Sequence, residues 1–365
     1  MSPIKIAHVA TGNVGRIALR QVIEDPRFEL VALVVSDDAK VGKDAGELAG
    51  AAVETGIRAV QGIEAAIAAS PDVVVYCAMG EVRPREAVAD VVACLKAGID
   101  VAATAPVPLL YPWGSMPDRV IERVQAACVE GGSSLFVNGV DPGWATDLLP
   151  LAVATTCQRV EQVRCLEIAD YATYDGADVM HFVMGFGTPV GEVPMLFQPG
   201  VLTSAWGPAL YGLADAFGVT LDEISESFEQ EPAPESFEVA VGTIAEGTVA
   251  AVRFQITGMV DGHPAFVVDH TTRLRPDLRP DWPQPAQPGG SYRLEITGEP
   301  SYVVDVCPTS THGDHNYSAI AVGAGRVVNA IPALRDAAPG IVTSKDLLPS
   351  RTLGRFVVSR FVGGK

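Results

Sequence analysis

Positive charge is scarce in this sequence. The 365 residues include 26 Lys and Arg against 44 Asp and Glu, which gives a formal net charge of −18 at pH 7. Proteins that bind DNA or RNA neutralise phosphates with clustered cations, and an acidic chain is repelled by anionic membrane surfaces. The composition therefore argues against nucleic acids and membranes as partners.

Long apolar runs and familiar cysteine motifs are also missing. The apolar runs are of strand length, whereas a membrane span needs about 18 residues, and the first residues lack the pattern of a signal peptide. The six cysteines show no C-x-x-C spacing, which is typical of reduced thiols in the cytosol. Neither G-x-S-x-G nor H-E-x-x-H occurs, so the usual hydrolase signatures are absent. We expect a cytoplasmic protein.

The first 140 residues alternate between strand and helix patterns. Short apolar segments, typical of strands buried on both faces, are separated by helical segments. The expected strands are 4–10, 30–35, 73–77, 101–104 and 134–137, and the expected helices are 16–25, 84–97 and 116–130. Such repeated units predict a Rossmann domain, with a parallel, doubly wound sheet between layers of helices.

The pattern changes after about residue 160. Five prolines between 276 and 288 exclude helix and central strand there, and we interpret this stretch as an extended excursion. Short strands joined by tight turns predict a mainly antiparallel sheet; they are 162–171, 237–241, 249–257, 265–271, 292–297 and 302–306, with helices at 194–217 and 325–335. We expect an α/β protein with a Rossmann domain (1–145 plus about 320–365) and an α+β domain (146–319).

A glycine-rich segment lies between the first strand and the first helix. It consists of Gly12, Asn13, Val14, Gly15 and Arg16. Glycine permits a tight turn and close approach of the backbone, and a helix N-terminus offers free N–H groups to a pyrophosphate. Although the spacing G-x-x-G-x-x-A is a variant of the usual fingerprint, its place in a βαβ series predicts dinucleotide binding.

The tip of the second strand bears on the choice of dinucleotide. An acidic residue at this position holds the ribose 2′-hydroxyl of NAD, whereas this chain has Ser36 there, with Arg16 and Lys40 nearby in the sequence. These residues suit a 2′-phosphate, although Asp37 favours NAD. The sequence therefore favours NADP, and NAD stays possible.

Several segments together resemble one known family. Residues 11–16, 40–48, 184–187 and 328–332 are similar to motifs of the dihydrodipicolinate-reductase-like family, above all to 2,4-diaminopentanoate dehydrogenases and native amine dehydrogenases. The resemblance covers most of the chain, from residue 4 to about 350. It implies the two domains described above, a homodimer, and hydride transfer between NAD(P)H and a C=O or C=N bond. Amine dehydrogenases of this family aminate ketones with ammonia.

The resemblance also implies positions for the site. It places Asn329 beside the nicotinamide and the segments 138–144 and 167–171 around the substrate. The remaining expected cofactor contacts are Ala78, Met79 and Thr104, and the expected substrate contacts are Val107, Asp141, Trp144, Tyr174 and His181.

One feature of the relatives is missing. They carry a glutamate just after the strand that ends at Thr104, where it activates ammonia, whereas residues 104–112 of this chain contain no carboxylate and Val107 occupies the matching position. A positioned acid–base group is worth roughly 10²–10⁴-fold in rate. The gap argues against amination unless another carboxylate replaces the missing one.

Glu167 and Tyr171 are the candidates for the proton-transfer role. They share one face of the strand 162–171, because side chains alternate along a strand. His312 and His315 flank Asp314 in a turn-like segment, where we expect no metal.

Three functions stay open. The first is an NAD(P)H-dependent oxidoreductase that reduces a small, fairly apolar ketone, aldehyde or imine, with the proton from Tyr171, Glu167 or water. The second is an amine dehydrogenase whose carboxylate has moved, most simply to Glu167. The third is a dinucleotide-binding sensor without turnover.

Overall fold

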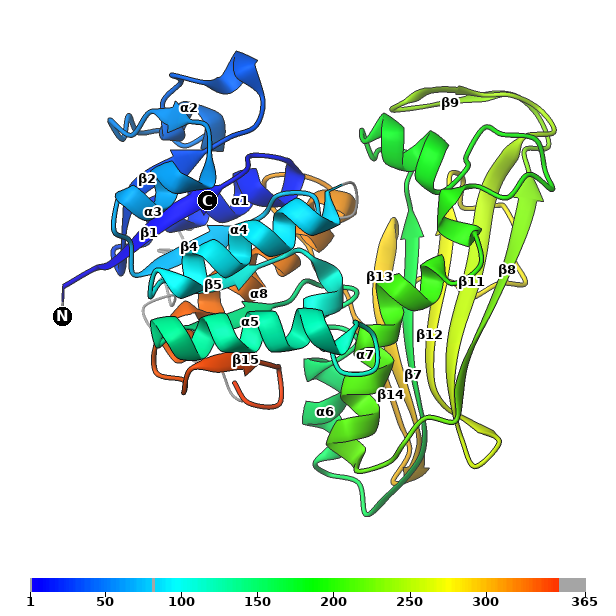
Figure 1. Cartoon of the computed structure of the whole chain (residues 1–365). Helices are drawn as coiled ribbons and strands as arrows, with labels where there is room; N and C mark the ends of the chain where they lie inside the picture. Colours follow the sequence, from blue (N-terminus) through cyan, green and yellow to red (C-terminus); the bar gives the residue numbers. More distant parts are fainter. Residues whose placement is uncertain (1, 81–82, 348–365) are drawn as a thin grey trace, which may run out of the picture.

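The computed structural model describes residues 2–80 and 83–347, and it contains two domains, each built around its own sheet (Figure 1). The strands of the larger sheet run in the order β15-β6-β5-β4-β1-β2-β3, and all neighbours are parallel. Apart from β15, this is the Rossmann strand order 3-2-1-4-5-6 read from the other edge. The predicted α/β class is therefore confirmed.

The first sheet lies between two layers of helices. Strands β4, β5 and β6 have no exposed residue, as expected for parallel strands covered on both faces. The strands are β1 (Ile4–Val9), β2 (Phe28–Val34), β3 (Ala59–Val60), β4 (Val73–Tyr76), β5 (Asp100–Ala103), β6 (Ser134–Val137) and β15 (Gly340–Val342). One face carries α1 (Asn13–Glu24), α2 (Ala45–Ala49) and α8 (His315–Arg335), and the other carries α3 (Ile63–Ala68), α4 (Pro84–Lys96) and α5 (Asp118–Gly131).

The chain returns to this domain at its C-terminal end. Helix α8 begins ten residues earlier than the sequence pattern predicts, because the Asp314 carboxylate accepts a hydrogen bond from the Tyr317 N–H and caps it. Among the described residues, α8 is the one helix long and apolar enough to cross a membrane, but half of it is buried, including Arg326. It packs against α1 and the sheet as a core helix does. Residues 348–365, the last part of the predicted Rossmann domain, lie outside the described residues. The domain boundaries stay a prediction.

The second sheet is mainly antiparallel, as predicted, with β7 and β12 as its one parallel pair among the described strands. Helices α6 (Leu148–Ala154) and α7 (Val201–Phe217) cover one of its faces (Figure 1). Its order is β14 (Tyr302–Val306), β13 (Gly290–Glu299), β7 (Arg159–Asp170), β12 (His263–Arg273), β11 (Val249–Val260) and β8 (Glu223–Pro232).

Several strands differ from the prediction, and the short strands β3, β10 and β15 are among those that were not predicted. The edge strand β8 was not predicted, because it is rich in glutamate, which is depleted in strands. The predicted strand 237–241 does not join the large sheet; β9 (Phe237–Val239) pairs with β10 (Gly242–Ile244) in a separate hairpin.

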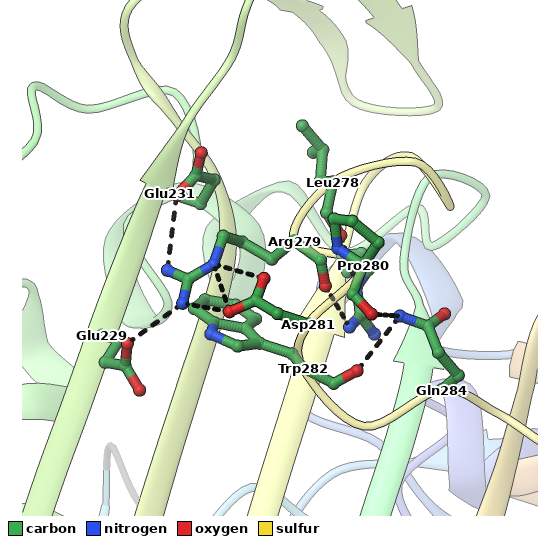
Figure 2. Close-up of polar contacts among 9 residues, drawn as sticks. Glu229, Glu231, Leu278, Arg279, Pro280, Asp281, Trp282 and Gln284 are labelled. Carbon is green, nitrogen blue, oxygen red and sulfur yellow. Dashed lines mark hydrogen bonds and ion pairs between the residues drawn. The ribbon is translucent and has the colours of Figure 1, made fainter.

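The proline-rich segment 276–288 is an excursion that lies against the second sheet (Figure 2), but it is built largely of turns rather than extended, with Leu278 N–H bonded to the Arg275 carbonyl and Trp282 N–H to the Arg279 carbonyl. Arg279 forms ion pairs with Asp281 in the segment and with Glu229 and Glu231 on β8. Its guanidinium also lies 4.3 Å from the ring centre of Trp282, which is buried. These contacts tie the segment to the sheet, so it does not act as a linker between domains.

Candidate functional site

A cavity of about 720 Å³ lies between the two domains. The first domain contributes the loop after β1 and the ends of β2, β4 and β5, and the second domain contributes β7, β12 and β13. Most of the predicted site residues line this cavity: Gly12, Asn13, Val14, Gly15, Ser36, Lys40, Ala78, Met79, Thr104, Val107, Asp141, Glu167, Tyr171 and Tyr174.

Four predicted site residues lie outside this lining. Arg16 is exposed on the first turn of α1, one residue beyond the lining glycine. Asn329 faces α1, where its side-chain oxygen accepts a hydrogen bond from Gln21 at 3.1 Å. His181 is bonded through its ring to the carbonyl of Phe186 at 2.9 Å, and its helical turn presents other side chains to the cavity.

Trp144 is the fourth of these residues. It is half-buried and does not line the cavity, whereas Trp206 of α7 does. The predicted tryptophan wall therefore comes from a different part of the chain.

The loop between β1 and α1 fits a dinucleotide phosphate. No side chain caps the start of α1, so its first N–H groups are free to bind an anion. A Cβ at Gly15 would lie 2.3 Å from the carbonyl oxygen of Ala10, which makes glycine necessary for the close packing of helix and strand. Asn13 of this loop and Tyr174, which follows β7, both line the cavity.

Two carboxyl groups and an imidazole meet in the cavity, with one carboxyl group following a strand of the first domain and the other two groups on strands of the second. Glu167 on β7 lies opposite His270 on β12, and Asp141 follows β6. The polar atoms of these three side chains lie within 4.8 Å of one another. Glu167 and His270 are only 8% and 5% exposed, so water does little to screen their charges. We call Asp141, Glu167 and His270 the acid–imidazole cluster.

Each carboxylate of the acid–imidazole cluster has a fixed partner. The Tyr171 hydroxyl donates to Glu167 Oε1 at 2.9 Å, and the Trp206 indole N–H donates to Asp141 Oδ1 at 2.7 Å. Asp141 Oδ2 lies 3.1 Å from His270 Nε2. The orientation of this last pair is that of an ion pair rather than of a hydrogen bond, and neither atom has another hydrogen-bond partner.

The protonation of the acid–imidazole cluster follows from burial and charge. Burial alone lowers the pKa of His270, but the negative charges of Asp141 and Glu167 outweigh it and raise the pKa to about 8. Burial raises the pKa of Glu167 above its usual value, and the His270 charge only partly opposes this. Burial, with the neighbouring Glu167, raises the pKa of Tyr171 well above its usual value. At neutral pH the imidazole is therefore charged, and Glu167 is the carboxyl group whose pKa is shifted towards neutrality.

The acid–imidazole cluster has the donor set of a metal site, but its charges favour proton chemistry. Among the described residues, these are the His, Cys, Asp or Glu side chains that come close enough together to share an ion. A metal ligand must be a neutral imidazole, whereas Asp141 stabilises the protonated ring of His270. The two histidines considered from the sequence do not form such a group: His315 bonds to the carbonyl of Asp170, and His312 is exposed.

His270 is the functional residue that sequence reasoning missed. The predicted strand 265–271 contains it, and in β12 it shares a face with the buried Phe266 and Val268. A histidine at an inward position of a strand was the available signal. Its partners were not predictable, because β12 pairs with β7 from about 100 residues earlier in the chain.

The end of the cavity beside the acid–imidazole cluster is apolar. His270 stacks on Phe254, with ring centres 4.6 Å apart, and meets the edge of Trp206 at 4.8 Å. The other apolar side chains at this end are Val179, Val183, Met184 and Leu196. The cluster therefore lies at the boundary between an apolar pocket and the dinucleotide loop.

A buried network holds the segment that carries Asp141. Asn138 Nδ2 and Ser344 Oγ donate to Asp147 Oδ2 at 2.7 and 2.6 Å, and Arg326 of α8 donates to Ser344 at 3.0 Å. Two residues near the C-terminal end, Arg326 and Ser344, thereby fix the segment after β6 that carries Asp141.

Comparison with known proteins identifies relatives over the whole length. Residues 144–357 match the family described as 2,4-diaminopentanoate dehydrogenase C-terminal domain. The chain is 40% identical over 347 residues to an amine dehydrogenase of Streptomyces virginiae, which covers 94% of this chain and 96% of the relative. It is 27% identical over 252 residues to the 2,4-diaminopentanoate dehydrogenase of Acetoanaerobium sticklandii, with coverages of 68% and 67%.

Solved structures show the same fold. The amine dehydrogenase from Mycobacterium smegmatis superimposes with a TM-score of 0.77 at 19% identity, over 95% of this chain and 97% of that chain. GenD2 from gentamicin A biosynthesis, in complex with NAD, superimposes with a TM-score of 0.53 at 16% identity, over 95% and 90%.

The relatives bear on the three functions considered from the sequence. They are dehydrogenases, so an enzyme is supported over a sensor without turnover, and an amine dehydrogenase-like enzyme is better supported than a carbonyl reductase. The chain belongs to the family of 2,4-diaminopentanoate dehydrogenases and amine dehydrogenases, which are NAD(P)-dependent oxidoreductases.

Proposed function

We propose that this enzyme is an ammonia-dependent amine dehydrogenase that aminates an apolar ketone and in which Glu167 replaces the missing loop carboxylate. The observation that carries the proposal is the acid–imidazole cluster, which lines the same cavity as Val107 and the dinucleotide loop. The cavity thus lacks a carboxylate on the loop but has one on its opposite wall.

The proposed reaction joins a ketone to ammonia and reduces the product. The ammonia nitrogen attacks the carbonyl carbon, and Glu167 takes a proton from nitrogen and returns it to the carbonyl oxygen, which gives a carbinolamine. Glu167 then receives a proton from His270 and passes it to the hydroxyl, so that water leaves and a protonated C=N bond forms. The bound dinucleotide supplies the hydride that reduces this bond. One proton is consumed in addition, and His270 beside Glu167 is its proposed source.

The surroundings of Glu167 suit both proton transfers. An acid–base group works best when its pKa lies near the working pH, and burial shifts the pKa of Glu167 upwards. The hydrogen bond from Tyr171 fixes one oxygen of the carboxyl group, which leaves the other to exchange protons with the substrate.

The cavity supports a substrate without a carboxylate. Among the described residues that line it, the basic side chains are Lys40, near the dinucleotide loop, and His270 and His315. His270 is already paired with Asp141, and His315 is bonded to a backbone carbonyl. Because no arginine of the residues that the structure describes lines the cavity, a plain ketone fits this pocket better than a keto acid.

Ammonium dependence tests the proposed function directly. Consumption of NADPH and NADH is measured with a panel of apolar ketones, aldehydes and cyclic imines, with and without ammonium. We expect turnover of ketones only when ammonium is present. Equal turnover without ammonium would instead establish plain carbonyl reduction.

We further propose NADP as the preferred dinucleotide. Ser36 and Lys40 line the cavity at the tip of β2. Asp37, the residue that favours NAD, caps the following turn by accepting a hydrogen bond from the Ala39 N–H at 2.9 Å. Asp37 also lines the cavity, and the Lys40 ammonium, which donates to the Thr11 carbonyl of the dinucleotide loop at 3.3 Å, is the charge that we assign to a 2′-phosphate.

Replacing Lys40 by alanine is expected to weaken NADPH binding about tenfold, because a charge-assisted hydrogen bond contributes roughly 1.5–3 kcal/mol, while NADH binding changes less than about twofold. Fluorescence titration of both dinucleotides measures the two dissociation constants. Lys43→Ala is the matched control, since Lys43 is exposed and does not line the cavity. An equal loss for NADPH and NADH would contradict a contact with the 2′-phosphate.

We also propose a homodimer in the cytoplasm. The family resemblance supports the dimer, and the cysteine pattern supports a reducing compartment. Light scattering of the purified protein measures the molecular mass, and a monomer would contradict the first of these two proposals.

A further inference from the structure

The dinucleotide loop has alanine at a position where the usual fingerprint has glycine. Read from the end of β1, the segment is Ala10-Thr11-Gly12-Asn13-Val14-Gly15. Its spacing is that of G-x-G-x-x-G, with alanine in place of the first glycine, which makes the tight turn. When the segment is aligned in this way, the loop differs from the usual fingerprint only at its first glycine, which is replaced by Ala10.

Ala10 adopts the backbone conformation that glycine would provide. Its φ is +74°, in the left-handed region that side chains with a Cβ disfavour. This conformation places the Ala10 carbonyl oxygen close to Gly15. A Cβ at Gly15 would lie only 2.3 Å from that oxygen. The turn at Ala10 thus lets the strand pass close to the first turn of α1. Something in the surrounding structure must compensate for the missing glycine.

The side chain of His8 supplies a contact at this point. His8 lies in the centre of the parallel sheet and is fully buried. Its Nε2 lies 2.8 Å from the Ala10 carbonyl oxygen, two residues along the chain. The acceptor is a carbonyl, so Nε2 carries the hydrogen. The other ring nitrogen, Nδ1, is buried without a hydrogen-bond partner, so the bond to Ala10 is the clearest polar role of this ring.

The charge state of His8 agrees with this role. Burial lowers the pKa of His8 to about 4, so the ring is neutral throughout the range in which dehydrogenases work. A neutral ring has one N–H. The donor therefore stays directed at the Ala10 carbonyl and does not switch with pH.

We propose that His8 is a positioning residue for dinucleotide binding, which holds the left-handed turn at Ala10 in place of the usual first glycine of the loop. His8 does not line the cavity, so it acts on the dinucleotide only through the backbone of the loop. The inference concerns binding rather than amination, and it stands independently of the proposed proton chemistry.

The test is a double-mutant cycle between His8→Leu and Ala10→Gly. His8→Leu removes the N–H donor and is expected to weaken NADPH binding about fivefold, the value of one ordinary hydrogen bond, with kcat at saturating dinucleotide unchanged. Ala10→Gly alone should change binding less than about twofold, because glycine adopts the turn without help. In the double variant, Ala10→Gly should restore binding to within about twofold of the wild type.

Two further variants separate positioning from general stability. Val75→Ala removes a buried side chain on the same face of the neighbouring strand and does not touch the cavity; it should lower the melting temperature without weakening binding. His8→Gln keeps an N–H donor, and it serves if His8→Leu does not fold. Unchanged binding in His8→Leu, or a loss in the double variant as large as in His8→Leu alone, would overturn the proposal.

Discussion

Replacing Glu167 by glutamine is expected to lower kcat for ammonia-dependent amination by about 10²–10⁴-fold, the usual value of a positioned acid–base group. Glutamine keeps the size of the side chain and accepts the hydrogen bond from Tyr171, but it cannot take up or release a proton. Dinucleotide binding should be unchanged, because the phosphate loop lies in the other domain. Steady-state kinetics at saturating ammonium and dinucleotide titration measure the two effects separately.

The same experiment has a matched control on the same strand. Glu161 lies on β7 but is exposed, and it pairs with Arg159 far from the cavity. Glu161→Gln should therefore leave kcat unchanged. The pH profile adds a second test: the acid limb of kcat in the wild type should lie above the usual range of a glutamic acid, since burial raises its pKa, and it should disappear in Glu167→Gln. Near-normal amination by Glu167→Gln would exclude Glu167 as the replacement for the loop carboxylate.

Replacing Asp141 by asparagine is expected to destabilise the fold by about 2 kcal/mol at pH 6, because it leaves the buried charge of His270 without its closest partner and one pKa unit corresponds to about 1.4 kcal/mol. Asparagine still accepts the hydrogen bond from Trp206, so the change isolates the charge. The pKa of His270 is about 8 in the folded state, above the 6.5 of a free histidine. The pair therefore contributes fully below about pH 6.5, and its contribution disappears as the pH rises through 8.

Denaturant unfolding at pH 6 and pH 9 measures this difference. The destabilisation by Asp141→Asn should be largest at pH 6 and should shrink to less than about 1 kcal/mol at pH 9, where His270 is neutral in both proteins. The double variant Asp141→Asn/His270→Gln should be more stable at pH 6 than the sum of the two single effects indicates. A destabilisation of equal size at both pH values would show that Asp141 acts through packing rather than through charge.

Local patterns predicted much of the fold and part of the site. The strand–glycine–helix sequence located the loop at Gly12 and Gly15, and two-residue alternation predicted that Glu167 of β7 and Tyr171, the residue after β7, face the same way; both line the cavity. Both features depend only on residues close together in the chain. Helix α8 began earlier than predicted because its cap, Asp314, lies before the periodic apolar pattern.

The site features that the sequence did not predict depend on contacts between residues far apart in the chain. His270 became part of the site only because β12 pairs in parallel with β7, which places it opposite Glu167. Asn329 was placed beside the nicotinamide by resemblance, whereas the rotation of α8 turns it towards Gln21, and Asn316 of the same helix lines the cavity. No local pattern reports strand neighbours across a hundred residues or the rotation of a packed helix.

The position of Glu167 on the central strand of a sheet has a consequence for how this enzyme can change. Glu167 is held by backbone pairing on both sides, opposite His270 on one neighbour and Tyr292 on the other, whereas a carboxylate on a loop moves with every insertion or substitution nearby. In the proposed mechanism, the loop at Val107 and the helical turn at Val179–Val183 line the cavity but carry no proton chemistry. We therefore expect that directed evolution of these two segments can change the size of the substrate that is accepted while the proposed acid–base group stays in place.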